Sequence, residues 1–421
     1  MDYNEAISYI HSFTPARGPK RSLDRTRDLL SRLGSPERKL RYVHITGTNG
    51  KGSVAAMTES VLRSAGYKTG LFTSPFLNRF NERIRINGED IPDEDLARLV
   101  SRVRPYIDRL PDVPTEFEVV TVLALTYFAE KDCQIVVLEV GMGGRSDYTN
   151  VIPAPETAVF TSVGLDHIKQ LGGTVRAIAE NKAGIIKPGC EVIAGPLPPE
   201  AMEVISSRAE EIGARLSSVR ASALKVTKRS LSGVTFDFGG YKGLTVPLAG
   251  DHQAFNAAAA ILVCRALRRR GFRITPACIR KGLESVSWPG RMELLREKPL
   301  FFLDGAHNPQ AVAAAASFFR DSGLEPVFLV AAMEDKDIDG ILDILTSVGS
   351  RFVTLPLEYR RAMDAEALAE KIRSRGAQAF AADSAAQAVS AAADLAGERG
   401  CVCALGSLYM SGLVREEVNR L

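Results

Sequence analysis

Residues 44–54 read HITGTNGKGSV: a β-branched segment runs into three glycines, a lysine and the start of a helical pattern. A glycine-rich turn between a strand and a helix points several backbone N–H groups at one place, and the helix N-terminus adds about half a positive charge. We therefore favour an anion-binding loop, with Lys51 directed at phosphate groups, over a plain strand–turn–helix connection. The spacing departs from the common G-x-x-x-x-G-K-[ST] loop, because Ile45 replaces its first glycine and Ser53 comes one place late. The loop alone does not distinguish a kinase, a GTPase and a ligase.

Strand-like runs alternate with helical runs on both sides of this loop, as in YVHIT at 42–46 and IVVLEV at 135–140. This alternation predicts an α/β fold with a mostly parallel sheet covered by helices on both faces. Between residues 224 and 248 the pattern changes to short alternating segments separated by glycines, which predicts a small antiparallel patch of hairpins.

A chain of 421 residues exceeds what one hydrophobic core usually supports, so we expect two domains. The strand–helix alternation restarts with FFLD at 301–304. The sequence therefore predicts an N-terminal domain over 1–295, which contains the phosphate loop, and a smaller Rossmann-like α/β domain over 296–421.

Composition gives no sign of a nucleic-acid or membrane partner. The 53 Lys and Arg residues nearly balance the 50 Asp and Glu residues, giving a net charge of +3. The longest apolar runs, such as 257–264, are shorter than the roughly 18 residues that span a membrane, and the first residues lack a signal-peptide pattern. We therefore expect a cytoplasmic protein.

Its six cysteines form no C-x-x-C pair, which favours buried thiols over a zinc site.

A second cluster, LEVGMGGRSDYTN at 138–150, places Glu139 at the end of a buried strand and just before a glycine-rich turn. Ligands bind at the carboxyl ends of the strands in such a sheet. A carboxylate near a phosphate loop suits Mg²⁺, which prefers oxygen ligands and shares them with substrate phosphates. The alternative is an ion pair between Glu139 and Arg145.

Three of the five histidines, His167, His252 and His307, lie in polar settings at strand ends or beside glycines, which favours a function for them. Asn256 lies in the first turns of a predicted helix, where it is either functional or only a helix-start residue. The loop that carries His307 belongs to the second predicted domain. Two domains that each offer a polar loop predict a cleft that closes on its substrates.

Together and in this order, these clusters resemble the folylpolyglutamate synthase and dihydrofolate synthase family, within the wider Mur ligase group. The shared motifs span nearly the whole chain: GTNGKGS (47–53), TSP (73–75), NERI (81–84), FE (117–118), E-x-G-x-G-G-R-x-D-x-T-N (139–150), DH (166–167), KAGI (182–185), HQ-x-x-NA (252–257), WPGR-x-E (288–293) and DGAHNP (304–309). The shorter phosphate loop, with its displaced Ser53, is the form that this family carries.

The resemblance implies an ATP-dependent ligase that joins L-glutamate to the carboxylate of dihydropteroate or a reduced folate. The carboxylate would attack the γ-phosphate of ATP, and glutamate would then displace phosphate from the acyl phosphate. By similarity, the catalytic residues are Lys51, Lys182 and His167, and two Mg²⁺ ions are expected, with Ser74, Glu139 and His167 as metal ligands. The substrates would be small molecules and the protein a monomer.

The family also implies nucleotide-binding and acceptor-binding residues. The nucleotide would contact Gly47, Thr48, Asn49, Gly50, Lys51, Gly52, Ser53, Asn256, Arg291, Asp304 and His307. The acceptor would contact Ser22, Leu23, Thr115, Glu116, Phe117, Glu118, Ser146, Asp147 and Tyr148. Three departures from the family pattern, at Ser22, Phe76 and Tyr148, bear on the choice of acceptor rather than on the chemistry.

Lys182 corresponds to the carbamylated lysine of this family. Carbamylation needs a neutral amine, which is scarce at pH 7 when the lysine pKa is near its ordinary value of about 10.4, so neighbouring positive charge must lower that pKa. Without the modification, Lys182 would be a cation facing the phosphates.

Two other functions fit parts of the sequence. One is a Mur-type ligase that joins an amino acid to a non-folate carboxylate, such as a peptidoglycan precursor. The other is a nucleotide-binding regulator that ligates nothing. The NERI and FE pairs and the GTNGKGS loop favour the folate branch over the Mur-type ligase for a non-folate carboxylate. A nucleotide-binding regulator would need neither Lys182 nor the second-domain motif.

Overall fold

The computed structural model describes residues 1–13 and 22–421, and the chain divides into two compact units. Unit 1 comprises Met1–Leu224 and Phe255–Val286, and unit 2 comprises Lys225–Ala254 and Ser287–Leu421. The segment predicted to form hairpins thus lies almost wholly in unit 2. The domain boundary expected after residue 295 stays a prediction.

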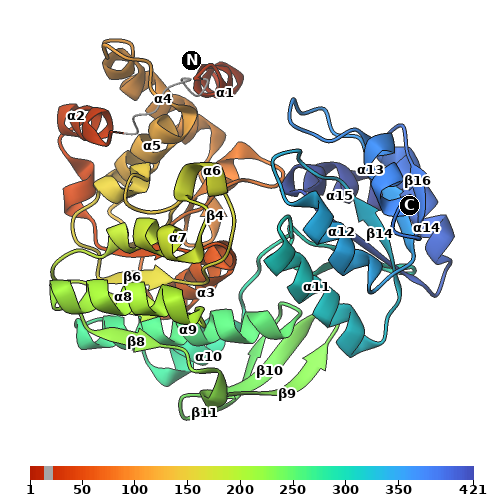
Figure 1. The fold of residues 1–421 in the computed structure, drawn as a ribbon. Coiled ribbons are helices and arrows are strands. Elements are labelled where there is room, and N and C mark those ends of the chain that lie inside the picture. The colour runs from red at the N-terminus through yellow and green to blue at the C-terminus, as the bar shows by residue number, and fades with distance from the viewer. Residues whose placement is uncertain (14–21) are drawn as a thin grey trace. The chain divides into compact units, whose positions relative to one another are not determined.

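Unit 1 is built on an eight-stranded sheet with the strand order β4-β3-β2-β5-β1-β6-β7-β8. Figure 1 labels β4, β6 and β8 of this sheet. Its strands are β1 (Tyr42–Thr46), β2 (Thr69–Phe72), β3 (Ile84–Ile86), β4 (Glu89–Asp90), β5 (Ile135–Glu139), β6 (Thr157–Phe160), β7 (Glu191–Ala194) and β8 (Leu216–Ser218). Only β3 and β4 run antiparallel to their neighbours. Parallel pairing sets Ile45 opposite Glu139 and Thr46 opposite Phe160. The carboxyl ends of β1, β5 and β6 therefore meet at one edge, as predicted from the strand–helix alternation.

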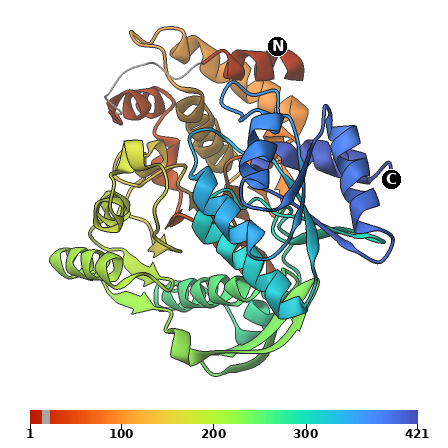
Figure 2. The same cartoon turned by 45° about the vertical axis from the view of Figure 1, so that its right-hand side comes forward.

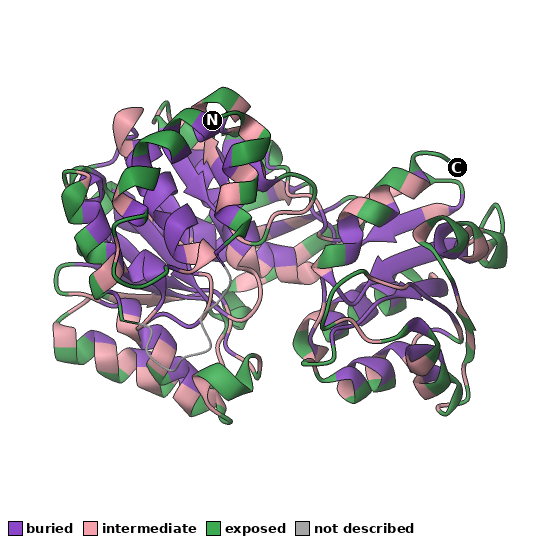
Figure 3. Cartoon of the chain, turned by 90° about the horizontal axis from the view of Figure 1, so that it is seen from above, coloured by how far each residue is buried: buried purple, intermediate pink, exposed green. Residues whose placement is uncertain are grey.

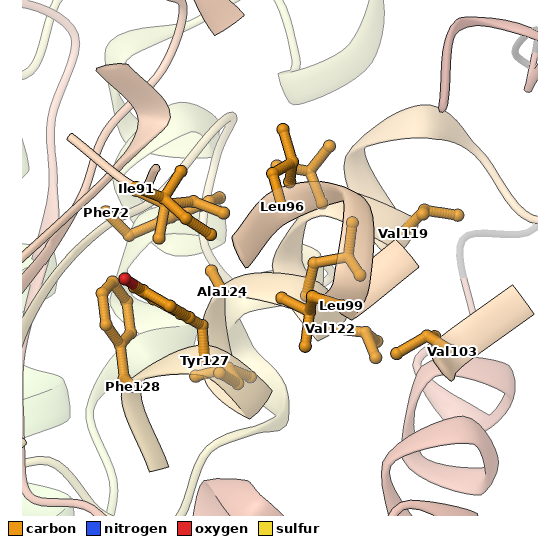
Figure 4. Packing of buried hydrophobic residues seen from close by; sticks show 14 of the residues in the cluster. Phe72, Ile91, Leu96, Leu99, Val103, Val119, Val122, Ala124, Tyr127 and Phe128 are labelled. Carbon is orange, nitrogen blue, oxygen red and sulfur yellow. The ribbon is translucent and has the colours of Figure 1, made fainter. Parts of the chain in front are cut away.

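The helices of unit 1 cover both faces of this sheet. They are α1 (Tyr3–His11), α2 (Asp24–Arg32), α3 (Lys51–Ser64), α4 (Asp93–Ile107), α5 (Glu116–Glu130), α6 (Ile168–Leu171), α7 (Val175–Lys182), α8 (Pro199–Ile212), α9 (Asp251–Arg269), whose first residues belong to unit 2, and α10 (Pro276–Glu284). Helix α5 is apolar on nearly all sides because it lies between the sheet and α4. Figure 4 shows Phe72 of β2 and Phe128 of α5 in the core that this packing forms.

Unit 2 holds two sheets. The three-stranded sheet has the order β11-β10-β9, from β9 (Leu224–Ser230), β10 (Gly233–Phe238) and β11 (Tyr241–Val246), and β10 pairs antiparallel with β11 as predicted. The six-stranded sheet has the order β12-β13-β17-β14-β15-β16, and only β12 pairs antiparallel. Its strands are β12 (Glu293–Glu297), β13 (Leu300–Leu303), β14 (Pro326–Val330), β15 (Arg351–Thr354), β16 (Gln378–Ala381) and β17 (Cys401–Leu405).

Helices cover both faces of the six-stranded sheet, as two views show (Figure 1, Figure 2). The helices α11 (Pro309–Ser322), α12 (Ile338–Thr346) and α13 (Ala365–Arg373) share one core cluster with it. The helices α14 (Ala385–Ala396) and α15 (Ser411–Val418) share the other. This arrangement confirms the second α/β fold expected from the sequence.

The central strands of both large sheets are buried (Figure 3). All six cysteines are free thiols; Cys278 is half-buried and the other five are buried, as expected. No helix in the described parts of the chain combines the length and the apolar character that crossing a membrane requires.

Candidate active site

The loop at 47–53 joins β1 to α3 and leaves the start of that helix open to an anion. Gly50 is the N-cap residue, with a φ of 81°, and no side chain caps the helix. The first turn of α3 contains no acidic residue. Position 50 requires glycine for two reasons. The left-handed φ disfavours residues with a side chain, and a Cβ atom there would lie 2.6 Å from Asn256 Oδ1. The helix dipole and the N–H groups of this uncapped first turn suit a phosphate.

The segment that follows β6 fixes the conformation of this loop. The Thr48 N–H donates to Ser162 O (2.9 Å), and the Asn49 N–H donates to Ser162 Oγ (2.8 Å). Thr161 Oγ1 donates to Asn49 O (2.6 Å) and would lie 1.9 Å from a Cβ atom on Gly47. Thr161 and Ser162 were not predicted as site residues, although a pair of hydroxyl residues directly after a predicted strand is a signal that could have indicated them.

Two lysines converge on one carbonyl group of the loop. Lys51 Nζ donates to Gly47 O (3.1 Å) and Thr48 O (3.2 Å), and Lys182 Nζ donates to the same Gly47 O at 2.8 Å. Lys182 lies at the last position of α7 and is only 2% exposed. The structure thus brings together two of the predicted catalytic residues from distant parts of the sequence.

Burial, followed by the charge of Lys51, lowers the pKa of Lys182 to about 7. Asp166 and Asp147 oppose this shift. Neighbouring positive charge was the cause expected from the sequence, but burial contributes more to the lowered pKa. A buried lysine with this pKa is neutral in a large fraction of molecules near neutral pH.

Ser53 offers a further sign that this region receives a ligand. Its Oγ is buried and has no hydrogen-bond partner among the described residues. Buried hydroxyl groups are nearly always hydrogen-bonded in folded proteins. The Ser53 hydroxyl is therefore suited to a group that enters the loop from solution.

Glu139 lies at the end of β5, only 4% exposed, with its Oε2 atom 3.4 Å from the Ser74 backbone N. Arg145, the alternative partner of Glu139, is exposed, and its guanidinium donates to Glu180 O (3.3 Å). His167 is exposed at the start of α6, with a φ of 50°.

The predicted metal ligands are thus a buried carboxylate, a hydroxyl residue beside it and an exposed imidazole. Within residues 1–13 and 22–421, no group of three or more His, Cys, Asp and Glu side chains is arranged around a metal position. The predicted set contains only two such residues, Glu139 and His167. Carboxylate and hydroxyl oxygens are the donors that Mg²⁺ prefers, so Glu139 and Ser74 fit this ion.

Glu139→Gln is expected to weaken the dependence of activity on Mg²⁺, because the amide keeps the shape of the side chain but loses its charge. The midpoint of a Mg²⁺ titration of ADP formation should rise at least about tenfold. Glu180→Gln, at an exposed position of α7, is the matched control. A Glu139→Gln titration that overlays that of the parent protein would remove Glu139 from the metal site.

Four residues predicted on the acceptor side lie together. The Phe117 ring lies 6.4 Å from that of Tyr148, and a Cβ atom on Gly141 would lie 2.6 Å from Phe117 Cζ. The Asp147 carboxylate, in the same turn, is buried. Ser146, next to it, is half-buried.

The other predicted acceptor residues are engaged within the protein. Thr115 and Glu118 form the capping box of α5, and the Glu118 carboxylate also accepts hydrogen bonds from Arg25 and Thr26. Glu116 pairs with His11 (3.2 Å) and lies 3.7 Å from Arg83. The exposed Ser22 hydroxyl donates to Asp24 (2.7 Å), and Leu23 is buried at the start of α2.

Phe76, one of the departures from the family pattern, packs against the core of unit 1. The Arg83 guanidinium lies 5.1 Å from the centre of its ring. The aromatic side chain at this position thus has a packing role of its own.

The predicted nucleotide residues of unit 2 form a cluster at the end of β13. The Asp304 carboxylate accepts hydrogen bonds from the N–H groups of Met292 and Ala306, both at 2.7 Å. Arg291 Nη1 would lie 2.3 Å from a Cβ atom on Gly305, and the His307 ring nitrogen Nδ1 lies 2.8 Å from Gly305 O. This cluster joins the WPGR segment to the DGAHNP loop.

In unit 1, Asn256 lies in the second turn of α9 and contacts the Gly50 position. It is therefore not the N-cap residue of α9, which removes the alternative that it serves only to start the helix.

Comparison with known proteins places both units in one class. The Mur ligase middle domain matches residues 45–264, and the Mur ligase glutamate ligase domain matches residues 290–408. This sequence is 39% identical to folylpolyglutamate synthase of Lacticaseibacillus casei over 369 residues, which cover 85% of this chain and 86% of that protein. It is 38% identical to dihydrofolate synthase/folylpolyglutamate synthase of Bacillus subtilis (strain 168) over 375 residues, 86% of each chain.

A solved structure of an FPGS–AMPPCP–folate complex superposes with a TM-score of 0.86 and 36% identity, over 99% of this chain and 100% of that one. Fold and site thus define a Mur-type ligase. More narrowly, the chain belongs to the folylpolyglutamate synthase and dihydrofolate synthase family.

Proposed function

We propose that this ligase adds L-glutamate to the carboxylate of dihydropteroate, of a reduced folate, or of both, with conversion of ATP to ADP and phosphate. The observation that carries the proposal is the convergence of Lys51 and Lys182 on Gly47 O in an uncapped phosphate loop. The related FPGS bound to AMPPCP and folate supports the same pair of ligands. We expect the protein to act as a monomer in the cytoplasm.

The chemistry explains why the site needs cations. A carboxylate of the acceptor must approach the γ-phosphate of ATP, although both are anions, and forms an acyl phosphate as ADP leaves. The amine of glutamate then attacks the acyl carbon and displaces phosphate, which leaves an amide bond. Lys51 would turn from its loop carbonyls to the phosphates and offset the negative charge of the transferring group.

In this proposal the nucleotide phosphates lie against the loop at 47–53 and the start of α3, and Asn256 lies beside them. Arg291, Asp304 and His307 form the nucleotide surface of unit 2. The acceptor lies near Phe117, Asp147 and Tyr148, which the structure groups together.

Mg²⁺ would be held by Glu139, Ser74 and His167 and would neutralise phosphate charge. Lys182 would carry a carbamate, formed when its neutral amine takes up CO₂. The lowered pKa of Lys182 supports this role, because it supplies the neutral amine that carbamylation requires. The carbamate anion would take the place of an ammonium group beside the loop.

The assay that tests this function measures ADP release with dihydropteroate, tetrahydrofolate and a peptidoglycan-precursor carboxylate, each with and without glutamate. A folate-branch ligase releases ADP with at least one pterin acceptor and needs glutamate for turnover. Release only with the peptidoglycan precursor would instead identify a ligase for a non-folate carboxylate. ADP release that depends on neither acceptor nor glutamate would identify a nucleotide-binding regulator.

A further inference from the structure

His44, in the middle of β1, is a fully buried polar residue to which the proposed chemistry gives no role. Its Nε2 atom lies 2.8 Å from Thr149 Oγ1, and its Nδ1 atom has no hydrogen-bond partner among the described residues. Burial, and then the charge of Lys187, hold the pKa of His44 well below its usual range, so the ring is neutral.

The partners settle the direction of each hydrogen bond. Thr149 Oγ1 lies 2.5 Å from Asp147 Oδ1, and a carboxylate can only accept, so the Thr149 hydroxyl donates to Asp147. The Thr149 oxygen must then accept from His44, which requires the tautomer with the proton on Nε2. This assignment agrees with the unpartnered Nδ1 atom. The result is a chain of hydrogen bonds from His44 through Thr149 to Asp147.

Backbone groups complete the support of the Asp147 carboxylate. Its Oδ1 atom also accepts from the Thr149 N–H (3.0 Å), and its Oδ2 atom accepts from the Met142 N–H (2.9 Å). Strand β1 makes a second bond to the same turn, because Thr46 Oγ1 donates to Gly143 O at 2.6 Å. The strand that leads into the phosphate loop therefore also fixes the turn at 141–149.

The next residues of the chain are fixed from another element. Lys187 Nζ donates to Asn150 O (3.0 Å) and Ile152 O (2.5 Å), on either side of Val151. The 3₁₀ turn Tyr148–Val151 is thus held at both ends. All of these contacts restrict lateral movement of Asp147, and the His44–Thr149 pair reaches its carboxylate through side chains.

We infer that His44 and Thr149 are positioning residues for the acceptor site: they hold the Asp147 carboxylate at a fixed place relative to the phosphate loop. The inference rests on the proposed function, in which Asp147 and Tyr148 contact the pterin-bearing acceptor. A rigid link from β1 to Asp147 keeps the acceptor carboxylate in register with the phosphate that it attacks. Such positioning acts on acceptor binding and leaves nucleotide binding unchanged.

The test measures KM for the acceptor and KM for ATP in Thr149→Val, Thr149→Ser and His44→Leu. Valine is nearly isosteric with threonine, so Thr149→Val removes the hydroxyl with little change in packing. We expect the acceptor KM to rise about tenfold in Thr149→Val, the cost of a hydrogen bond to a charged group, with the ATP KM within about twofold of the parent value. Thr149→Ser restores the hydroxyl and should return the acceptor KM to near the parent value.

A double-mutant cycle connects His44 to the same chain. If His44 acts through the Thr149 hydroxyl, His44→Leu should raise the acceptor KM in the parent background and have little effect in the Thr149→Val background. Additive effects would show that His44 does not act through Thr149. Unchanged acceptor KM values in a folded Thr149→Val protein would overturn the inference, as would equal increases in both KM values. The proposed function fails separately, if the parent protein itself turns over no pterin acceptor.

Discussion

Lys182→Ala is expected to abolish ligation while the protein remains folded. The side chain is buried against the phosphate loop at Gly47 O, and its removal deletes both the amine and the carbamate that it would carry. Loss of a preorganised charged group at a reaction centre lowers kcat by roughly 10²–10³-fold. A short carboxylate in solution should restore activity by filling the vacated position. The rescue should be partial, because the free carboxylate must lose translational and rotational freedom that the tethered group has already lost, a difference of up to several kcal/mol. Steady-state ADP release measures ligation, and circular dichroism shows whether the protein is folded.

Labelled bicarbonate gives a direct control. The parent protein and Lys187→Met should both take up label, and Lys182→Ala should not. Lys187 is a half-buried lysine whose pKa is lowered to about 8, but it donates to backbone carbonyls away from the loop. Because the pKa of Lys182 is lowered to about 7, its amine is neutral above that pH, and uptake should fall as the pH drops below it. Parent-level ligation by a folded Lys182→Ala protein would exclude the carbamate, and so would activity in Lys182→Arg.

Lys51→Ala is expected to stop ATP turnover without unfolding the protein. Lys51 is half-buried and its ammonium group donates to the loop carbonyls of Gly47 and Thr48, so replacing the side chain removes little packing from the core. In the transition state it would offset the charge of the transferring phosphoryl group, and kcat should fall roughly 10²–10³-fold. ADP formation under saturating ATP measures this effect.

Lys39→Ala, at an exposed position of the same unit, is the matched control and should retain parent activity. Thermal unfolding of both variants separates loss of chemistry from loss of fold. Near-parental ADP formation by a folded Lys51→Ala protein would show that the loop lysine does not act on the phosphates.

Much of the fold could be predicted because local sequence determines it. The alternation of apolar runs with helical patterns gave the parallel sheet, and the glycines around residues 232–243 gave the antiparallel hairpins. Glu139 was predictable at the edge of the sheet because strand β5 ends at this residue. These features depend on short stretches of chain whose periodicity can be read directly.

The parts that escaped prediction depend on contacts between distant segments. His44 reads as an ordinary strand residue, and only the fold brings Thr149 to its ring. The sequence also gives no measure of how deeply Lys182 is buried, although burial is the main cause of its lowered pKa. The hydrogen bonds that the Glu118 carboxylate accepts from Arg25 and Thr26 also join distant segments and could not be read from the family motif; its contact with the acceptor stays a prediction. Charge environment and long-range pairing arise only when the chain is folded.

The central claim is that the acceptor carboxylate is activated as an acyl phosphate. It is tested most directly with an acceptor whose carboxylate carries a heavy isotope of oxygen. If the carboxylate attacks the γ-phosphate and glutamate then displaces phosphate, one labelled oxygen must pass into the released inorganic phosphate, in an amount equal to the amide formed. Mass spectrometry of the phosphate and of the glutamyl product measures both quantities. Amide formation with phosphate that carries no label would contradict the account.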